Sequence, residues 1–397
     1  MLDTALIIGA SVAGTRVATD LRRHGYRGRV LLVDAQDELP YDRPPLSKSA
    51  LTGDRIAPVR LLTADAAAAA GIELRLGAAA GKLDTDAAVV TLTDGTELRF
   101  DELVIATGAR ARPTPWPRHE RIVELRTLEQ ARHLHTALRS SRHIAVVGAG
   151  FIGAEVASAA RSLGLRVSLI DPVEVPVGRL FGDALGRRFH DLHSANGVSC
   201  HFGIGVESLE PHDSLVEVTL GDGTRLTVDI VVVGIGVEPD IDWLAGSGVV
   251  LDDGVLCDSR CRAVGHRNIR AAGDVARWFH PRHGKPIRVE HWTNAVEQAQ
   301  FVAAAIARPD DGDEFAPVEY VWSDQYDWKI QIAGVPQRQH EPIVIPSPRP
   351  AALCALWCDG HGVVVGGLSV NWPKAAILMR RAIASAGSAE AIRAALA

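Results

Sequence analysis

The sequence lacks features that mark several large protein classes. No apolar run approaches the roughly 20 residues that cross a bilayer. The apolar segment after Met1 is only about five residues long and has no basic start, so a secretory signal is not expected. Positive charge is scarce, because 42 Lys and Arg stand against 48 Asp and Glu and leave a net charge of -6. A general nucleic-acid binder usually needs a basic surface, so this class is excluded.

Cysteine is also rare, and its spacing matches no common metal or redox motif. The five cysteines are Cys200, Cys257, Cys261, Cys354 and Cys358. Two pairs have three intervening residues, so neither is C-x-x-C, and no histidine stands at a zinc-finger spacing. The strand-like stretch "LCALWC" predicts that Cys354 and Cys358 share one packed face. A structural role is favoured over metal binding or redox chemistry, and a reducing, cytoplasmic location is expected.

The chain is long enough for several domains, and two dinucleotide-type turns organise it. Its 397 residues suit two or three domains. In "ALIIGASVAGTRVA", Gly9 and Gly14 occupy the outer positions of a G-x-G-x-x-G fingerprint and Ser11 replaces the middle glycine. "HIAVVGAGFIGAEVA" repeats the fingerprint with Gly148, Gly150 and Gly153. Each copy follows an apolar strand and precedes a helical pattern, which is the context that supports a dinucleotide site.

Both copies continue in the same way. The strands "RVLLVDA" and "RVSLIDP" end in Asp34 and Asp171. These acids lie about 20 residues beyond the fingerprint, where a carboxylate accepts hydrogen bonds from an adenosine ribose. Further on, "TLTDGTELRFDELVIATG" matches "TLGDGTRLTVDIVVVGIG". The Asp-Gly pairs predict two-residue hairpin turns, each followed by a buried strand that ends in glycine. The chain therefore carries one design twice.

Two such copies predict two different dinucleotides held face to face. Ser11 is small enough for the backbone to approach a pyrophosphate, so we interpret it as a tolerated variant. The helix N-terminus supplies free N–H groups and a positive dipole end in either case. The first copy is longer than the second, and its extra residues are expected in the loop "LPYDRPPLSKSALTGD" (39–54).

The remaining segments are simpler. "NIRAAGDVARW" places Gly273 and Asp274 after a short strand, which indicates either another nucleotide contact or a plain turn. The alanine run at 64–70 predicts a helix. Pro309 and the acidic "DDGDE" indicate a linker. After it, the sequence predicts strands at 320–324, 329–335, 352–358 and 362–370, and a helix at 372–386.

Over nearly its whole length the chain resembles the FAD-dependent NAD(P)H:ferredoxin reductases of bacterial oxygenase systems, the putidaredoxin reductase and biphenyl dioxygenase reductase group. The matching stretches include "GASVAG", "YDRPPLSK", "LRTLEQA", "VVGAGFIGAEVA", "AAGDVA", "EHWTNAVEQA" and "SDQYDWKIQIAG". The resemblance implies an α/β fold of the glutathione-reductase type with two Rossmann-like domains and a C-terminal α+β domain. The implied boundaries are 1–111 with 238–308 for FAD, 112–237 for NAD, and 309–397 for a C-terminal interface domain.

The resemblance also implies roles for individual residues. Contacts to FAD are implied for Gly9, Ser11, Ala13, Gly14, Asp34, Arg43, Lys48, Ala80, Thr107, Gly108, Arg126, Gly273, Asp274 and Trp292, the last against the isoalloxazine ring. Cofactor contacts in the second copy are implied for Gly148, Gly150, Phe151, Ile152, Gly153, Glu155, Asp171 and Gly236, with NADH as the ligand.

Lys48 and Glu155 are the implied catalytic pair. An ammonium near the flavin would stabilise the negative charge that reduction leaves on the ring, and Glu155 would hold this lysine in place. The plainer alternatives are a solvated loop lysine and a helix-start acid favoured by the helix dipole. Asp171 and Glu174 would repel the 2′-phosphate of NADPH, so NADH is the predicted donor.

The positions of the cysteines in the sequence indicate from which group electrons leave the protein. Disulfide reductases of this fold, NADH peroxidases and coenzyme A disulfide reductases need a cysteine in the N-terminal part, and this chain has none before Cys200. Electrons are therefore expected to pass directly from the flavin to an iron–sulfur ferredoxin that feeds an oxygenase. Candidate docking residues are Lys374, Arg380 and Arg381, although an ordinary solvated helix face also explains them. An NADH oxidase without a protein partner and a non-enzymatic redox switch are the alternatives.

Overall fold

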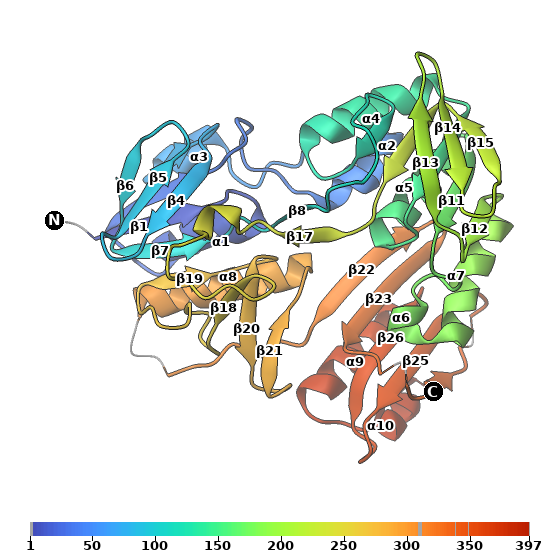
Figure 1. Ribbon diagram of the computed structural model, residues 1–397. Helices are drawn as coiled ribbons and strands as arrows, with labels where there is room; N and C mark the ends of the chain where they lie inside the picture. The colour runs from blue at the N-terminus through green and yellow to red at the C-terminus, as the bar shows by residue number, and fades with distance from the viewer. Residues whose placement is uncertain (1–2, 309–311, 338, 348, 397) are drawn as a thin grey trace. The chain divides into compact units, whose positions relative to one another are not determined.

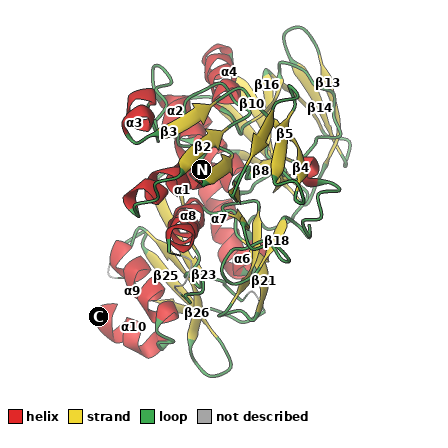
Figure 2. Ribbon diagram, turned by 90° about the vertical axis from the view of Figure 1, so that its left-hand side faces the viewer, coloured by secondary structure: helices red, strands yellow, loops and turns green. Residues whose placement is uncertain are grey.

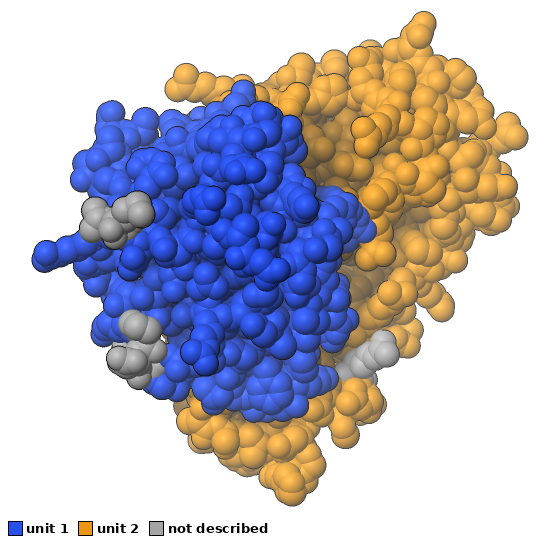
Figure 3. Space-filling view, turned by 60° about the vertical axis from the view of Figure 1, so that its left-hand side comes forward, with its two compact units in different colours: residues 1–42, 58–110, 238–317 blue, residues 43–57, 111–237, 318–397 orange. Residues whose placement is uncertain are grey.

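The computed structural model describes residues 3–308, 312–337, 339–347 and 349–396, and Figure 1 follows the chain through its elements. The chain divides into two compact units, which Figure 3 colours separately. Unit 1 contains residues 1–42, 58–110 and 238–317, and unit 2 contains residues 43–57, 111–237 and 318–397. Each unit has hydrophobic cores of its own.

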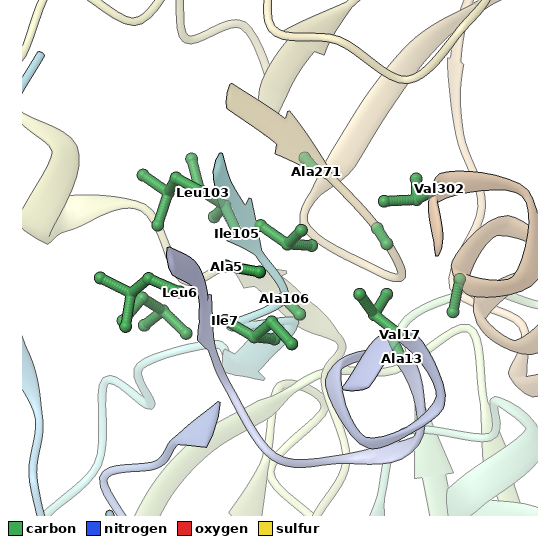
Figure 4. Packing of buried hydrophobic residues seen from close by; sticks show 14 of the residues in the cluster. Ala5, Leu6, Ile7, Ala13, Val17, Leu103, Ile105, Ala106, Ala271 and Val302 are labelled. Carbon is green, nitrogen blue, oxygen red and sulfur yellow. The ribbon is translucent and has the colours of Figure 1, made fainter. Parts of the chain in front are cut away.

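Unit 1 is centred on a five-stranded parallel sheet in the order β19-β7-β1-β2-β3. Its strands are β1 (Thr4–Ile8), β2 (Arg29–Val33), β3 (Ile72–Arg75), β7 (Glu102–Ile105) and β19 (Ile269–Ala271). Runs such as "TALII" and "RVLLV" are mostly apolar because both faces of such a sheet are buried. Figure 4 shows Ala13 and Val17 of α1 (Val12–Arg23) and Val302 of α8 (Trp292–Ala307) gathered beside side chains of β1 and β7.

Smaller elements complete unit 1. An antiparallel sheet of β4 (Ala80–Asp84), β5 (Val89–Leu92) and β6 (Glu97–Arg99) adds Leu83, Val90 and Leu92 to the same core. The other elements are α3 (Ala64–Ala69), η2 (Asp242–Leu244), β18 (Val255–Cys257), β20 (Ala276–His280) and β21 (Lys285–Arg288). The chain passes from one unit to the other within β8 (Ala109–Ala111) and at β17 (Val237–Pro239).

Unit 2 contains a second parallel sheet, in the order β12-β11-β10-β16-β9. Its strands are β9 (Ile122–Glu124), β10 (His143–Val147), β11 (Arg166–Asp171), β12 (Ser199–Phe202) and β16 (Ile230–Val233). Helices α4 (Leu128–Ser140) and α5 (Phe151–Ser162) belong to this part, as does an antiparallel sheet of β13 (Val206–Pro211), β14 (Val216–Leu220) and β15 (Arg225–Val228). Apolar residues of the two sheets form one core.

The C-terminal part of unit 2 is a five-stranded antiparallel sheet in the order β22-β23-β26-β25-β24. Its strands are β22 (Tyr320–Gln325), β23 (Trp328–Gly334), β24 (Ile343–Ile345), β25 (Leu353–Cys358) and β26 (Val364–Val370). Helices α9 (Pro373–Ala384) and α10 (Ala389–Leu396) pack on one face, as Figure 2 shows. On the other face, Phe181 of α6 (Gly178–Phe181) and Phe189 of α7 (Asp183–Ala195) pack around Trp357.

The repeated design predicted from the sequence is confirmed by topology. Strands β3-β2-β1-β7 and β12-β11-β10-β16 occur in the same spatial order, and in each copy a three-stranded antiparallel sheet lies along the chain between the third and fourth strands of this set. The two Asp-Gly turns also match: Gly95 and Gly223 have φ near +85°, with values of 84° and 85°. In each turn the aspartate accepts a hydrogen bond of 2.9 Å from the backbone N–H two residues later.

The loop expected at 39–54 proves to be partly helical. It contains the 3₁₀ turn η1 (Pro44–Ser47) and the short helix α2 (Ser49–Thr52). Proline at the first position of η1 presets φ for a helical turn, which the loop prediction did not weigh. Residues 43–57 belong to unit 2, where α2 contacts α4 and α5. The extra length of the first copy therefore forms a helical insert rather than an open loop.

Expectations for the C-terminal part are largely confirmed. The four predicted strands and the helix correspond to β22, β23, β25, β26 and α9, whereas β24 and α10 were missed because their apolar runs are short. Cys354 and Cys358 both contact the core under α9, as predicted. The linker prediction at Pro309 begins in residues 309–311, which lie outside the described residues. Within the described ranges, no helix combines the length and apolar character needed to cross a membrane.

Candidate cofactor sites

In the first fingerprint, the outer glycines are required by the protein's own backbone. Gly9 has φ +106°, and a Cβ placed on it would lie 2.2 Å from the carbonyl oxygen of Ala106. A Cβ on Gly14 would lie 1.8 Å from the carbonyl oxygen of Gly9. Both distances are far below van der Waals contact. A side chain at Gly14 would therefore push α1 away from the turn that precedes it, and one at Gly9 would push this turn away from the segment that follows β7.

In the second fingerprint the two outer glycines meet the same clashes, whereas the middle glycine does not. A Cβ on Gly148 would lie 2.3 Å from the Gly234 carbonyl oxygen, and one on Gly153 would lie 1.9 Å from the Gly148 carbonyl oxygen. A Cβ on Gly150, in contrast, has nothing within 4 Å. The middle glycine is thus not needed for packing and borders open space.

Ser11 occupies this middle position in the first copy. Its φ of -80° and ψ of -163° are ordinary extended values, so the serine causes no backbone strain. Its hydroxyl makes no cap hydrogen bond to α1. The opening motif is therefore an intact strand–turn–helix with a small side chain at the one position where packing tolerates it.

The two fingerprint helices begin without caps, although the chain caps other helices. Thr63 accepts a hydrogen bond from the backbone at the start of α3, and Thr127 forms a capping box with Gln130 at the start of α4. Helices α1 and α5 have no side-chain cap and no acidic residue in the first turn. Their first N–H groups therefore remain available, and an anion can accept from them. This arrangement fits a dinucleotide pyrophosphate at each helix.

Asp34 and Asp171 hold the two turns in the same way. One oxygen of Asp34 accepts from the backbone N–H of Ala10 at 2.5 Å, and the other accepts from Gln36 at 2.8 Å. The Asp171 oxygens accept from Ala149 at 2.7 Å and Val173 at 2.8 Å. Each carboxylate oxygen has a second lone pair, so a ribose hydroxyl can still donate to it. The acids thus anchor the turn and remain capable of binding a ribose.

The other residues predicted in unit 1 gather at the same sheet edge. Gly9, Asp34, Thr107 and Gly273 follow the carboxyl ends of four parallel strands, where ligands bind in such folds. Gly273 has φ +80°, and its N–H donates to Oε1 of the buried Gln298 at 2.8 Å. Ala80 begins β4, Gly108 has φ +72°, and Asp274 directly follows Gly273. Gln298 was missed because a glutamine inside a helix gives no sequence signal.

Trp292 has an unexpected partner. It is the first residue of α8, and its indole N–H donates to Oδ1 of Asp42 at 2.7 Å. Asp42 belongs to the matched stretch "YDRPPLSK", but no role was predicted for it. This hydrogen bond restricts the orientation of the large indole ring, because the ring must keep its N–H pointed at Asp42.

Three residues predicted to contact FAD belong to unit 2. They are Arg43 at the start of η1, Lys48 at its end, and Arg126, which precedes α4. Unit 2 also contains the residues of the second fingerprint, which follow β10, Asp171, which is the last residue of β11, and Gly236, which follows β16. Phe151 and Ile152 form the first turn of α5, and the Ile152 side chain is exposed.

Glu155 is the centre of a buried hydrogen-bond network in unit 2. The residue is 5% exposed, and its Oε2 lies 2.8 Å from Lys48 Nζ. The same oxygen accepts from the hydroxyl of Ser47 at 2.5 Å, and Oε1 accepts from Ser323 at 2.6 Å. The expected proximity of Lys48 and Glu155 is therefore present. Ser47 and Ser323 lie in matched stretches but were missed, because hydroxyl side chains are common and carry no motif of their own.

The cysteines do not form a redox centre in the described residues. All five are free, and Cys257, Cys261 and Cys354 are buried. Burial raises the pKa of Cys261 and of Cys354 to about 12, so both thiols stay protonated and unreactive at neutral pH. These observations agree with the structural role predicted for them.

Two parallel-sheet dinucleotide folds with uncapped fingerprint helices define a pyridine nucleotide- and flavin-dependent class of oxidoreductase. Comparison with known proteins identifies the family. The model of the "pyridine nucleotide-disulphide oxidoreductase" family matches residues 3–299, and that of the "reductase C-terminal" family matches residues 320–396. The chain belongs to the pyridine nucleotide-disulphide oxidoreductase family, which uses FAD and NAD(P)H.

Relatives cover nearly the whole chain. The anthranilate 1,2-dioxygenase system ferredoxin–NAD(+) reductase component of Burkholderia cepacia is 36% identical over 96% of this chain and 94% of its own length. Rhodocoxin reductase of Rhodococcus erythropolis is 34% identical over 96% of this chain and 89% of its own. In the covalent putidaredoxin reductase–putidaredoxin complex, a chain of 30% identity superposes with a TM-score of 0.91 and covers 99% of each chain. The predicted family and fold class are thereby confirmed.

The structure predicts that an added methyl group is tolerated at the middle glycine of the second fingerprint and destabilises the protein at the last one. Gly150→Ala meets open space, so the free energy of unfolding is expected to stay within about 1 kcal/mol of the wild type. Gly153→Ala would place a methyl against the Gly148 carbonyl oxygen and is expected to destabilise unit 2 by about 3 kcal/mol or more. Denaturant unfolding measures both. Equal stability of the two variants would contradict this division of roles.

Proposed function

We propose that this chain is a flavoprotein reductase that passes electrons from NADH through FAD to an iron–sulfur ferredoxin, which in turn serves an oxygenase. The observation that carries the proposal is the pair of uncapped fingerprint helices, α1 and α5, each beside an anchored aspartate. Two dinucleotide sites in one chain suit a transfer between two nucleotides. Relatives named as ferredoxin–NAD(+) reductases support the ferredoxin as acceptor.

The residues of unit 1 would hold FAD. The free N–H groups of α1 would bind its pyrophosphate, and Asp34 would accept from its ribose. Thr107, Gly108, Gly273 and Asp274 follow neighbouring strand ends, so they would contact the same ligand. In unit 2, α5 and Asp171 would bind NADH in the corresponding way. When bound, the two nucleotides supply the hydride chemistry, and the protein supplies orientation and charge.

Domain boundaries follow the same scheme. We propose an FAD-binding domain at 1–111 and 238–308, an NAD-binding domain at 112–237, and a C-terminal domain at 309–397. The two parallel sheets support the first two domains, and the antiparallel sheet with α9 and α10 supports the third. Arg43 and Lys48 lie in the helical insert 43–57, which packs with unit 2.

Lys48 and Glu155 are the proposed catalytic pair. The Lys48 ammonium would stabilise negative charge on the reduced ring, and it would do so only if held in one place. Glu155 provides this restraint through the 2.8 Å ion pair, and its burial strengthens the attraction because little water screens it. A solvated loop lysine would not be expected to pair with a carboxylate that is 5% exposed.

The direct test of the function is an anaerobic stopped-flow experiment on the purified full chain. Addition of one equivalent of NADH should bleach the flavin absorbance within about a second, as ordinary turnover numbers require. A two-iron bacterial ferredoxin should then strongly stimulate cytochrome c reduction. A colourless protein, or one that NADH reduces only over minutes, would contradict the proposal. Fast oxidation of NADH by oxygen without stimulation by ferredoxin would favour an oxidase instead.

Removing the Lys48 charge should slow flavin reduction. Lys48→Ala is expected to lower the rate of flavin reduction by NADH about tenfold or more, because the developing negative charge loses its partner. Rapid-reaction kinetics at saturating NADH measure this rate. Lys82→Ala, which removes an exposed lysine of β4, is the matched control and should leave the rate unchanged. Wild-type kinetics in Lys48→Ala would remove Lys48 from the mechanism.

The preference for NADH would come from acidic residues at the end of β11. Asp171 and the exposed Glu174 stand where a 2′-phosphate would be received, and the next cationic residue along the chain is Arg179 on α6. We expect kcat/KM with NADPH to be lower than with NADH by about tenfold or more. Glu174→Gln should narrow this ratio, whereas Glu207→Gln, another exposed acid of unit 2, should not. Equal efficiencies with both nucleotides would refute the assignment.

The outer face of α9 is the proposed ferredoxin docking surface. Lys374, Ile377 and Arg381 recur at helical spacing and are exposed, so an apolar side chain lies between two cations. The Arg380 guanidinium lies over the Tyr320 ring, 5.3 Å from its centre. Small ferredoxins are usually acidic, so this surface complements their charge, which would raise the rate of encounter.

Charge reversal tests the docking surface. The combined change of Lys374→Glu, Arg380→Glu and Arg381→Glu should lower ferredoxin-dependent turnover about tenfold or more at low salt, while NADH-to-ferricyanide activity stays normal. A control variant with Arg27→Glu, Lys82→Glu and Arg99→Glu changes the net charge equally on exposed residues of unit 1. If both variants lose turnover alike, or neither does, docking at α9 is excluded.

A further inference from the structure

A strand of the C-terminal sheet reaches the Lys48–Glu155 pair. Ser323 lies in β22, is 1% exposed, and donates its hydroxyl proton to Glu155 Oε1 at 2.6 Å. Gln325, two residues further on the same strand, donates from Nε2 to the Ser323 Oγ at 3.2 Å. Both residues lie in the stretch "SDQYDWKIQIAG", outside every role assigned so far.

The direction of these hydrogen bonds follows from the chemistry of the groups. An amide nitrogen only donates, so the Ser323 oxygen accepts from Gln325. The single hydroxyl proton of Ser323 is then directed to Glu155, whose ionised form accepts at both oxygens. Since Oε2 is occupied by Lys48 and Ser47, Ser323 is the donor that satisfies Oε1. These donors together fix the orientation of the buried carboxylate.

The position of Ser323 is set by the docking of its hairpin on α5. One helical turn after Glu155, the Ser158 hydroxyl oxygen accepts from the backbone N–H of Tyr326 at 2.7 Å. The Tyr326 hydroxyl lies 2.8 Å from Nδ1 of His193 on α7. Burial lowers the pKa of His193 to about 4 and raises the pKa of Tyr326, so at neutral pH the phenol donates to an uncharged imidazole. The turn is thus fixed at two further points.

Other charged groups near α5 do not replace Ser323. On β22, Asp324 is paired with Lys329 of β23 at 2.8 Å. On β10 and β11, which also pack against α5, the charged or titratable side chains are His143, Arg166 and Asp171. Among the described residues, Lys48 is the charged group paired with Glu155.

We propose that Ser323, oriented by Gln325, is a positioning residue that keeps the Glu155 carboxylate aimed at Lys48. The C-terminal sheet would thereby take part in the reductive step and not only in docking. This inference rests on the proposed function, since it assigns a residue to the same site. Without the serine donor, Oε1 of Glu155 loses its hydrogen bond, so the carboxylate can rotate and Lys48 loses its fixed partner.

The first experiment reads the hydrogen bonding of Glu155 directly and needs no NADH. Infrared spectra of the full FAD-bound protein are recorded at neutral pH on the wild type and Ser323→Ala, with Glu155→Gln as the spectral reference. The carboxylate bands of Glu155 should shift in Ser323→Ala, because Oε1 has lost its donor. The control is Ser369→Ala: Ser369 is also buried in the C-terminal sheet, but it donates to the Trp372 carbonyl oxygen. The Glu155 bands of this control should match those of the wild type.

The second experiment measures flavin reduction over a range of NADH concentrations. Ser323→Ala should lower the limiting rate about tenfold, while the NADH concentration that gives half of this rate stays unchanged. Gln325→Leu keeps the hydroxyl but removes its orienting donor, so it should lower the limiting rate by less. This second variant also serves if Ser323→Ala fails to fold.

The outcomes separate this inference from the function on which it rests. If NADH does not reduce the wild-type flavin, the proposed function fails, while the infrared spectra still test Ser323. If the wild type is reduced normally and the Ser323→Ala and Gln325→Leu variants match Ser369→Ala in both the Glu155 bands and the limiting rate, Ser323 has no positioning role.

Discussion

The close approach of a helix to the turn before it is the constraint on which the structure depends. At Gly14 and again at Gly153, the backbone comes so near to the preceding glycine carbonyl that no Cβ fits. This packing places the first residues of α1 and α5 against the turns before them. In addition, neither helix has a side-chain cap at its N-terminus. Because the anchoring aspartates repeat as well, the two proposed dinucleotide sites share one steric arrangement.

The cysteines of this chain differ from what its family name suggests. The family name refers to disulphides, yet no cysteine precedes Cys200, and the described cysteines are free. Electrons would therefore have to leave directly from the flavin. The chain has a buried carboxylate, Glu155, with donors from two segments: Ser47 and Lys48 of the helical insert, and Ser323 of the C-terminal strand β22.

Much of the fold was predictable because its signals are local. Apolar runs, fingerprint glycines and Asp-Gly turns depend on neighbours in the chain, so the two repeats and most C-terminal strands could be predicted. The insert at 39–54 was expected to be a loop, since its two short helices are stabilised by α4 and α5 rather than by propensity. Likewise β24 and α10 are too short for a periodic pattern to reveal, and their stability comes from packing.

The amino-acid sequence by itself determined the two nucleotide turns, their acidic partners and the family, because each requires particular residue types at fixed spacing. Only the tertiary structure decided which glycines are needed for packing and which one borders open space, since the clashing atoms come from the folded turn itself and from segments distant along the chain. It also decided the partners of Glu155. Ser47 and Ser323 are separated from Glu155 by more than a hundred residues, and no spacing rule connects hydroxyls so distant along the chain.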